Sequence, residues 1–192
     1  MIVIIRYNAG NTQSVENAVR RLGFDSIITN DIEQIQKADK VIFPGVGEAA
    51  TAMQHLQANG LDLAIKGLKQ PVLGVCLGLQ LMCNYTEESN TKGLGIFDVN
   101  VKRFPPLDIV PHMGWNTLSN CKGKLFTNIS EEEHFYFVHS YYAEGSPLSV
   151  ALCDYILPYS AALQKGNFYA VQFHPEKSGK AGEQLLKNFL SL

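Results

Sequence analysis

Short apolar runs alternate with longer amphipathic segments through the first half of the chain. The apolar runs predict strands at 1–5, 26–28, 40–43 and 71–75. The amphipathic segments predict helices at 12–22, 48–58 and 61–69. Strands that are apolar throughout and joined by helices are typical of a parallel sheet buried on both faces. This half therefore predicts an α/β fold with a mostly parallel, doubly wound central sheet flanked by helices.

The second half is richer in β-forming residues, which are separated by short Gly, Pro and Asn turns. Its pattern predicts strands at 97–104, 135–142, 149–155, 161–165 and 168–173. We expect these strands to join the same sheet as mixed or antiparallel additions. A closing helix is predicted at 179–190 from the helical spacing of Leu185, Leu186, Phe189 and Leu190. With no internal repeat or linker-like stretch, the sequence predicts a single domain over residues 1–192.

Composition and charge narrow the possible functions. Hydrophobic residues make up 46% of the 192 residues and charged residues 18%, as in a globular protein with a core. The formal net charge of −2 gives no reason to expect nucleic acid or an anionic membrane as a partner. No apolar run approaches the roughly 20 residues that span a bilayer. Arg6 interrupts the apolar start of the chain, which predicts a strand rather than a signal peptide, and we expect a cytoplasmic protein.

The four cysteines are scattered and form no CxxC pair. This spacing argues against a structural zinc site and against a disulfide framework. Three of them, Cys83, Cys121 and Cys153, are expected to be small residues buried in a reducing compartment. The fourth, Cys76, has a different setting.

Cys76 lies where the predicted strand at 71–75 runs directly into a helical segment, 77–83. Gly74 and Gly78 flank it, and small neighbours are what a sharp strand-to-helix turn requires if a nucleophile is to stand clear of the backbone. The following helix directs its N-terminal N–H groups toward the sulfur, which favours the thiolate. We interpret Cys76 as a nucleophile, although a match of this kind alone is modest evidence against a buried, inert cysteine.

A base and a carboxylate follow at the end of the last predicted strand, in Phe173-His174-Pro175-Glu176. Residues two apart in an extended chain point the same way, so His174 and Glu176 can lie on one face with Pro175 stiffening the backbone. His174 would take the thiol proton and later protonate the leaving group, while Glu176 would hold the imidazole tautomer. The tripeptide alone is typical of a surface turn, but with a cysteine elbow at another strand end the catalytic interpretation is favoured.

The sequence Pro44-Gly45-Val46-Gly47 also lies at a strand end, on the strand before the one that carries Cys76. Two glycines around Val46 permit positive φ and leave the Val46–Gly47 peptide free to turn an N–H into the site. By itself this pattern is typical of an ordinary strand-to-helix turn. Its position beside the nucleophile favours an oxyanion hole.

Together, the sequences PGVG, GVCLGLQ and QFHPEKS resemble the class I, or triad, glutamine amidotransferase family. Three further stretches narrow the resemblance: YNAGN at 7–11, PHMGWN at 111–116 and YFVHSY at 136–141. With them the chain is similar to the glutaminase subunits of imidazole glycerol phosphate synthase, an enzyme of histidine biosynthesis. The match extends over essentially the whole chain, and its motifs fall in the expected order.

The resemblance implies hydrolysis of the glutamine side-chain amide through a glutamyl thioester on Cys76, with His174 and Glu176 completing a triad. The implied oxyanion hole consists of Val46, Gly47 and Leu77. Substrate contacts are implied for Gln80, one helical turn beyond the nucleophile, and for the backbone of Ser140 and Tyr141, which would hold the α-amino and carboxylate ends. No metal or organic cofactor is implied.

The resemblance also implies a separate (β/α)8 cyclase subunit as heterodimer partner. It would use the ammonia with a phosphoribosyl-aminoimidazole nucleotide to make imidazole glycerol phosphate and an aminoimidazole carboxamide ribonucleotide. Positions that match the family's subunit interface are Asn11, His112, Met113, Trp115, Asn116, Tyr136 and Lys177. Trp115, the only tryptophan, is typical of a protein contact because it falls in a loop with Pro and Gly; its alternative role is a core anchor.

We expect glutaminase activity to be low until the partner binds, because the Val46–Gly47 peptide can turn its N–H away from the site. Two stretches depart from the commoner family pattern. Arg6-Tyr7-Asn8 stands where Asp-Tyr-Gly is frequent, and Glu48-Ala49-Ala50 lacks the usual aromatic residue. These departures concern partner contact and activation and leave the triad intact. His55 and His134 are expected to be surface or packing residues.

Three alternative functions stay open. A glutaminase subunit for anthranilate or aminodeoxychorismate synthesis would share the triad, but it has no reason to carry PHMGWN or YFVHSYY. A free-standing γ-glutamyl hydrolase would need no partner surface and would be fully active alone. A non-catalytic binding module that kept the fold would have no need of Cys76, His174 and Glu176.

Overall fold

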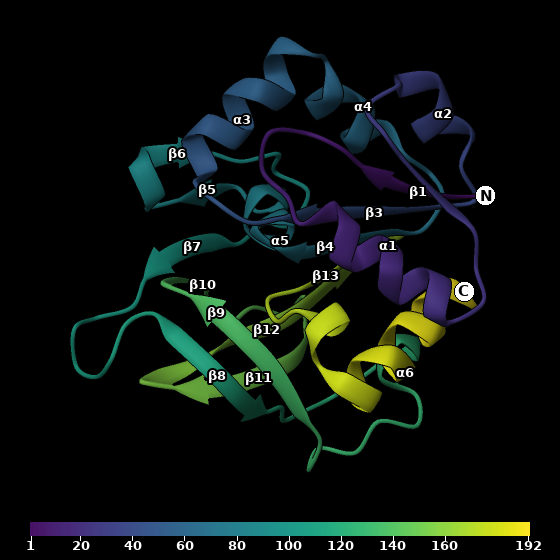
Figure 1. The fold of residues 1–192 in the computed structure, drawn as a ribbon. Helices are drawn as coiled ribbons and strands as arrows, with labels where there is room; N and C mark the ends of the chain where they lie inside the picture. The colour runs from purple at the N-terminus through teal and green to yellow at the C-terminus, as the bar shows by residue number, and fades with distance from the viewer.

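A central sheet runs through the molecule in the computed structural model, which describes residues 1–192 (Figure 1). Its first part is parallel and has the order β2-β1-β3-β4. The strands are β1 (Ile2–Ile5), β2 (Ser26–Thr29), β3 (Lys40–Gly45) and β4 (Val72–Cys76). They are connected by helices α1 (Thr12–Arg21), α2 (Ile32–Lys37), α3 (Ala49–Ala58) and α4 (Leu61–Gly67). The predicted parallel, doubly wound half is therefore confirmed.

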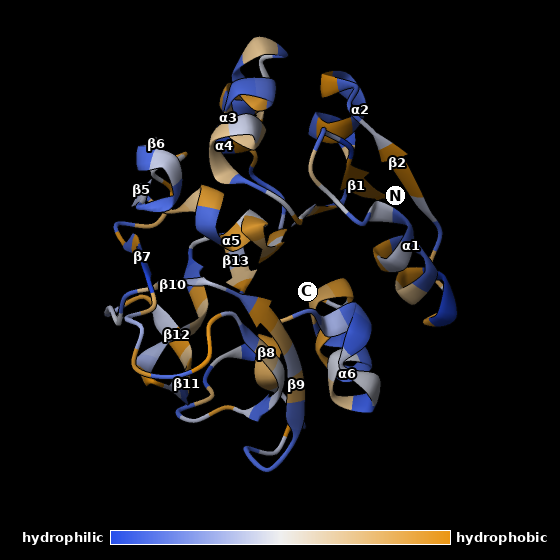
Figure 2. Cartoon of the chain, turned by 60° about the vertical axis from the view of Figure 1, so that its left-hand side comes forward, coloured by the Kyte–Doolittle hydropathy of each residue, from blue (hydrophilic) through white to orange (hydrophobic).

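Alternate residues of β1 point to opposite faces of the sheet, and both faces are covered. Ile2 and Ile4 belong to a core shared with α1, whereas Val3 and Ile5 belong to a second core shared with α2, α3 and α4. Figure 2 shows the hydrophobic residues gathered on the central strands and the polar residues on the outer faces of the helices. This double burial explains why the first-half strands are apolar throughout.

The sheet continues past β4 through the second half of the chain, in the order β13-β12-β10-β7-β5-β6, with β11 paired to β12. Strand β13 (Phe168–Val171) is parallel to β4, and β12 (Leu157–Lys165) is antiparallel to β13. The remaining strands are β5 (Tyr85–Thr86), β6 (Thr91–Lys92), β7 (Asn100–Arg103), β10 (Tyr141–Ala143) and β11 (Ser149–Tyr155). The expected mixed and antiparallel additions are thus present in this sheet.

A separate ribbon of two antiparallel strands, β8 (His112–Thr117) and β9 (His134–His139), packs beside the main sheet (Figure 1). This corrects two predictions. The segment 135–142 is predicted as one strand of the main sheet, but the chain leaves the ribbon at Ser140 and enters the main sheet as β10. The segment around Trp115 is predicted as a loop, but it is a strand. Three short elements also escape prediction: α2, with one buried residue, and the paired strands β5 and β6, with two residues each.

Helix α6 (Gly179–Leu190) packs on the α1 face and confirms the predicted closing helix. Short elements complete the chain: α5 (Leu77–Met82) and the 3-10 turns η1 (Glu88–Asn90), η2 (Lys124–Phe126) and η3 (Pro175–Lys177). None of the helices has the length and apolar character needed to cross a membrane.

Candidate active site

Cys76 forms the predicted elbow. It is the last residue of β4 and the residue immediately before α5, and its φ of 53° and ψ of −109° lie outside the usual regions for a non-glycine residue. Holding such a backbone conformation costs on the order of 1–3 kcal/mol, and strain of this kind is concentrated at functional sites. Cys76 lines a cavity of about 350 Å³ at the carboxyl ends of the parallel strands.

The glycines around Cys76 are required by close packing. A Cβ on Gly78 would overlap the carbonyl oxygen of Phe43 on β3, so α5 could not lie this close to the sheet. A Cβ on Gly74 would lie 2.8 Å from the sulfur of Met82 and 3.1 Å from the carbonyl carbon of Gly78. The glycine pattern around the nucleophile therefore sets the distance between β4 and α5.

His174 and Glu176 meet as predicted, by a different local geometry. Strand β13 ends at Val171, and the chain forms η3 at Pro175, so the two side chains meet across a 3-10 turn rather than along an extended strand. His174 Nδ1 lies 2.8 Å from Glu176 Oε1, and both side chains are buried. The predicted backbone conformation is therefore corrected: Pro175 starts a 3-10 turn and does not continue a strand.

The backbone of His174 is fixed to β9. Its N–H donates to the carbonyl of Tyr136 at 2.9 Å, and its own carbonyl accepts from the Ser178 hydroxyl at 2.6 Å. The same hydroxyl accepts from the Tyr136 N–H at 2.9 Å. Ser178, which is absent from the predicted site, therefore joins the catalytic turn to the β8–β9 ribbon.

The surroundings of His174 favour its protonated form. Burial by itself lowers the pKa of His174, but the neighbouring Cys76 sulfur and the Glu176 carboxylate outweigh burial and raise the pKa to about 10. Nε2 of His174 makes no hydrogen bond within the protein, and neither does the second carboxylate oxygen, Oε2, of Glu176. With Nδ1 held by Glu176, Nε2 is the ring atom free to exchange a proton with the nucleophile or with a ligand.

The cavity brings together the nucleophile, the predicted oxyanion hole and the predicted substrate contacts, whereas His174 and Glu176 line a second, small pocket that shares Val46 with it. The lining of the cavity includes seven predicted residues: Val46, Gly47, Cys76, Leu77, Gln80, Ser140 and Tyr141. Gly47 has a φ of 116°, which favours glycine at this position. Four further lining residues are absent from the predicted site: Glu88, Pro111, Val138 and His139. No group of three or more His, Cys, Asp or Glu side chains is arranged to hold a metal ion.

An amide chain links the nucleophile to the far wall of the cavity. Gln80 Nε2 donates to the Tyr141 carbonyl at 3.1 Å and to Gln172 Oε1 at 3.0 Å, and Gln172 Nε2 lies 3.6 Å from the Cys76 sulfur. Gln172 is fully buried and absent from the predicted site, although it stands inside the QFHPEKS stretch. Its burial is visible only in the structure, so the sequence carries no signal for Gln172 beyond its place in that stretch.

Glu88 supplies a carboxylate at the cavity wall. It accepts a hydrogen bond from the Ala49 N–H at 2.9 Å, and partial burial raises its pKa, with the charge on Glu48 adding to the effect. Glu48 itself caps α3 through Thr51. The acidic residue that follows PGVG in place of an aromatic residue therefore has a capping role in this chain.

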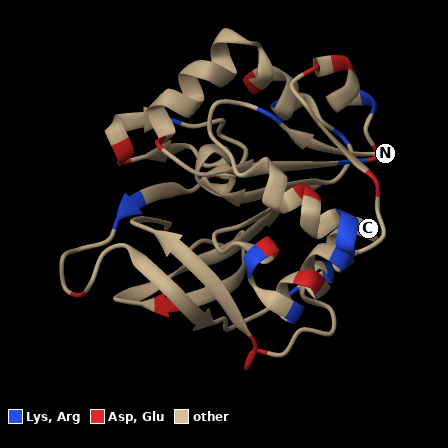
Figure 3. Ribbon diagram, viewed as in Figure 1, with Lys and Arg blue, Asp and Glu red and all other residues tan.

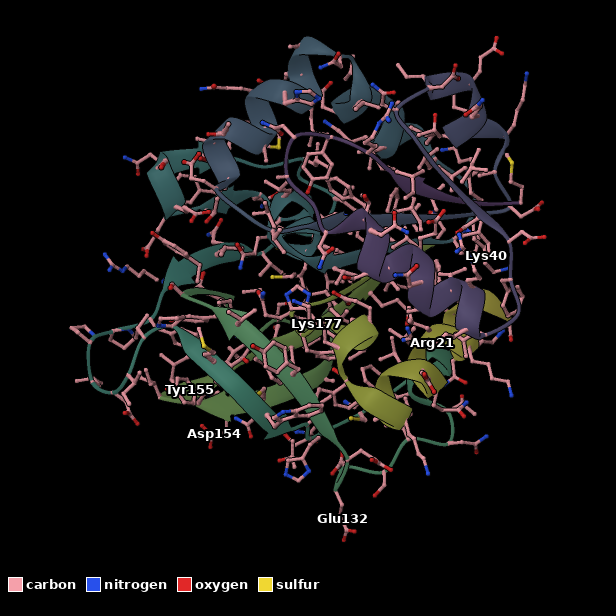
Figure 4. The ribbon with its side chains drawn as sticks, viewed as in Figure 1. Arg21, Lys40, Glu132, Asp154, Tyr155 and Lys177 are labelled. Carbon is pink, nitrogen blue, oxygen red and sulfur yellow. The ribbon has the colours of Figure 1, made fainter.

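The residues predicted at the partner interface fall into two groups. Met113 and Trp115 are 64% and 56% exposed on β8, and Trp115 packs edge-on against Tyr136 of β9. Lys177 lies 5.9 Å above the Tyr136 ring and is marked beside the ribbon in Figure 4. Trp115 is therefore not a core anchor.

Two predicted interface residues do not lie on this surface. His112 is only 4% exposed and departs from the expectation of a surface contact: it alternates with Met113 along β8, so its ring points inward while Met113 points outward. Asn11 is not part of the ribbon: it caps the start of α1, where its side chain accepts from the Ser14 N–H, and it lines a small pocket with His174 and Glu176.

Comparisons with known proteins agree with this geometry. The model of the family "Glutamine amidotransferase class-I" matches residues 3–192. The chain is 58% identical to the imidazole glycerol phosphate synthase subunit HisH of Bacteroides fragilis over 194 residues, covering 100% of this chain and 99% of that protein. It is 48% identical to the HisH subunit of Pasteurella multocida, covering 98% of this chain and 96% of that protein.

Solved structures share the fold at low identity. A crystal structure of a glutamine amidotransferase aligns with a TM-score of 0.75 at 17% identity, covering 99% of this chain and 97% of the other. PurLQS from Thermotoga maritima aligns with a TM-score of 0.72 at 16% identity, again covering 99% and 97%. These two comparisons support the arrangement of the sheet and helices.

Proposed function

The chain belongs to the class-I glutamine amidotransferase family and, within it, to the HisH subunits of imidazole glycerol phosphate synthase, and from this we propose that it is a glutaminase that supplies ammonia to a separate cyclase subunit. The observation that carries the proposal is the buried His174–Glu176 pair beside a strained cysteine that opens on a cavity. We further propose that residues 1–192 work as one glutaminase domain.

In the first half-reaction the Cys76 thiolate attacks the side-chain carboxamide carbon of glutamine, and a C–S bond forms. The carbonyl electrons move onto oxygen, where the backbone N–H groups of Gly47 and Leu77 would stabilise the negative charge. His174, protonated at neutral pH because of its raised pKa, gives its Nε2 proton to the departing nitrogen. The C–N bond breaks, ammonia leaves, and a glutamyl thioester remains on Cys76.

In the second half-reaction water attacks the thioester carbon while His174 Nε2 takes one of its protons. The C–S bond then breaks, glutamate leaves, and the Cys76 thiolate and the His174 imidazolium are restored. Glu176 keeps Nδ1 protonated and offsets the imidazolium charge throughout. We place this reaction in the cytoplasm, because a reducing compartment keeps the nucleophile as a free thiol.

The cavity suits an amino acid with a short polar side chain. Its volume of about 350 Å³ is at the small end of the range for ligand sites. Glu88 at the wall offers a carboxylate to the substrate's α-ammonium group, and the Ser140–Tyr141 backbone offers hydrogen-bonding groups to the same end of the molecule. Gln80 holds the Tyr141 carbonyl in place, so its part in binding is to shape the wall as well as to contact substrate.

The β8–β9 ribbon is the surface we propose for the cyclase partner. Neither strand contains a Lys, Arg, Asp or Glu, and Figure 3 shows the ribbon as an uncharged band among charged neighbours. Met113 and Trp115 project from it, and exposed Leu107 and Ile109 lie on the segment that leads into β8. An exposed apolar surface centred on a tryptophan is typical of a stable protein contact.

The test is glutamate release from glutamine by the purified chain, alone and with a HisF-type (β/α)8 cyclase and its nucleotide ligand. We expect activity that rises with the cyclase and that Cys76→Ala lowers by at least about 10⁴-fold, as expected for loss of a nucleophile. Thermal unfolding of the variant controls for folding. No activity with any partner would contradict the proposal, and full activity of the chain alone would identify a free-standing hydrolase instead.

A further inference from the structure

Behind the Ser140–Tyr141 wall lies a buried cluster of aromatic rings that the proposed mechanism does not use. Tyr159 of β12 is fully buried at its centre, with ring centroids 5.4 Å from His139 and 5.5 Å from Phe104. Its hydroxyl lies 3.1 Å from His139 Nε2 and 3.3 Å from His112 Nδ1. One phenol therefore bridges a histidine of the cavity wall and a histidine of the partner-facing strand.

The direction of each hydrogen bond follows from the chemistry of the atoms. His139 Nδ1 lies 2.7 Å from the Tyr141 carbonyl, which can only accept, so Nδ1 carries a proton. Burial lowers the pKa of His139 to about 3, so the ring is neutral and its Nε2 accepts from the Tyr159 hydroxyl. Because the Tyr159 hydroxyl donates its one proton to His139, its oxygen can only accept a hydrogen bond from His112 Nδ1–H.

The chain of hydrogen bonds ends under the exposed face of β8. Burial lowers the pKa of His112 to about 4, so this ring is neutral too, and its Nε2 is left as an acceptor 3.5 Å from the Asn116 amide nitrogen. Asn116 also donates to the Asp154 carbonyl at 3.1 Å. Tyr155 stacks on the His112 ring with centroids 3.9 Å apart, and Figure 4 marks Tyr155 and Asp154 at the end of β11.

At the other end, the Tyr141 carbonyl receives two donors, His139 Nδ1 and Gln80 Nε2. This carbonyl belongs to the cavity wall next to Ser140. The carbonyl is part of the planar Tyr141–Tyr142 peptide, so these two donors fix the orientation of the backbone on the C-terminal side of Tyr141, which lines the cavity. The wall is therefore held from behind by neutral rings, each of which has one permitted tautomer.

We propose that Tyr159 is a positioning residue. Its hydroxyl fixes both imidazoles and thereby holds the substrate-binding backbone at Ser140–Tyr141 in a fixed position relative to β8. This inference rests on the proposed glutaminase function. A phenylalanine would fill the same volume without placing a hydroxyl in the core, where a polar group is costly to bury unless it is paired. Tyr159 is paired on both sides, as expected of a network that specifies one arrangement.

The first test compares the glutaminase kinetics of wild type and Tyr159→Phe in the complex with the cyclase. We expect KM for glutamine to rise about five- to tenfold while kcat stays within about twofold, because the variant loosens the binding wall and leaves the triad in place. Tyr169→Phe is the matched control: Tyr169 is a buried tyrosine on the adjacent strand β13, packed on Phe189 and outside the chain of hydrogen bonds. It should leave both constants unchanged.

The second test reads the tautomers directly by ¹⁵N NMR of the imidazole nitrogens in the isolated chain. In wild type, His112 and His139 should both show a protonated Nδ1 and an unprotonated Nε2 at pH 7. In Tyr159→Phe, His112 loses the acceptor of its Nδ1 proton, so its signals should shift toward the average of two tautomers. Tyr169→Phe should retain the wild-type pattern.

The outcomes separate the two proposals. Suppose that wild type is active but Tyr159→Phe has the same KM, or the same His112 tautomer, as wild type. Either result would overturn the positioning role and leave the glutaminase function standing. A parallel fall of kcat and thermal stability without a change in KM would mean that Tyr159 supports only the core. Wild-type protein that is inactive with every partner would overturn the glutaminase function, and the positioning role with it.

Discussion

The two walls of the cavity are built by different means. On the Cys76 side the geometry is set by the backbone: parallel strands β3 and β4 in register, a strained residue at the elbow, and glycine contacts that hold α5 against the sheet. On the Ser140 side the chain passes from the β8–β9 ribbon into β10, and side-chain hydrogen bonds from Gln80 and His139 hold the wall.

This difference matches the demands on each wall. Nucleophilic attack depends on the position of one sulfur relative to its base, and a misplacement of 1 Å can cost about 10²-fold in rate, so a rigid backbone suits that wall. Substrate binding needs the polar groups of this wall to be held in one arrangement. The β8–β9 ribbon and the main sheet share no strand pairing, so hydrogen bonds between neutral rings, each worth about 1 kcal/mol net, hold the wall relative to β8.

The largest effect is expected on the rigid side, from Glu176→Gln. A glutamine amide can donate to His174 Nδ1 and so place the ring proton on Nε2, which prevents the imidazole from accepting a proton from water or the thiol. We expect kcat to fall by about 10³- to 10⁴-fold with folding retained. Glutamate release and thermal unfolding would measure the two quantities.

Glu183→Gln is the control for this change. Glu183 lies on α6 and its carboxylate pairs with exposed Arg21, so the same substitution there removes a charge outside the site. Figure 4 marks Arg21 on α1, away from Lys177 and the catalytic turn. Wild-type kcat in Glu176→Gln would show that the carboxylate is not needed to orient His174.

A smaller effect is expected on the ribbon side, from Trp115→Ala. Removing this exposed indole should weaken binding of the cyclase by about 30-fold, or about 2 kcal/mol, as for a central aromatic contact. Glutamine turnover by the isolated chain should change less than twofold. Calorimetric titration of the two subunits measures the affinity. Leu63→Ala, at an even more exposed apolar residue on α4, should bind as wild type does, and equal weakening by both changes would argue against the ribbon as the interface.

The smallest effect is expected from the neutral rings behind the ribbon, in acid. The folded-state pKa values of His112 and His139, about 4 and about 3, lie below the unfolded value of about 6.5. Their contribution to stability is therefore complete above about pH 6.5, and it is lost as the pH falls from there toward the folded-state values, because in that range only the unfolded chain takes up these protons. His174, whose folded-state pKa is raised, loses its contribution on the alkaline side instead.

The Tm of the protein should fall between pH 7 and pH 4.5. In His112→Gln this fall should be smaller than in wild type by about 2–4 °C, which corresponds to on the order of 1 kcal/mol of unfolding free energy. The comparison uses the slope, so a lower Tm at pH 7 does not affect it. His134→Gln, at an exposed imidazole on β9, is the control and should keep the wild-type slope. An unchanged slope in His112→Gln would mean that this ring is protonated in the folded protein.

The Cys76 wall could be predicted from the sequence because each part of it is a contiguous pattern. The apolar run of β4, the glycines at 74 and 78 and the His-Pro-Glu sequence each report a local requirement. The prediction that the His174 and Glu176 side chains meet was right, but the predicted extended backbone between them was wrong. Pro175 alone does not distinguish a stiff strand from the first residue of a turn.

The Ser140 wall could not be predicted in the same way. In β8 the polar His112 is buried and the apolar Met113 and Trp115 are exposed, which inverts the usual strand pattern and hides the strand. His139, Tyr159 and Gln172 come together only through strand pairing over long separations. Histidine and tyrosine are often partly buried and glutamine is mostly exposed in proteins, so nothing local marks these three residues as parts of a site.

The unequal burial of the four thiols makes this protein suitable for selective chemical labelling. Cys83 and Cys153 are buried, and burial raises the pKa of Cys121 to about 11. Only Cys76 combines an opening on a cavity with a neighbouring histidine that carries a proton. A glutamine-shaped electrophile should therefore attach one group per chain, and the rate of attachment would report cavity opening without any turnover assay.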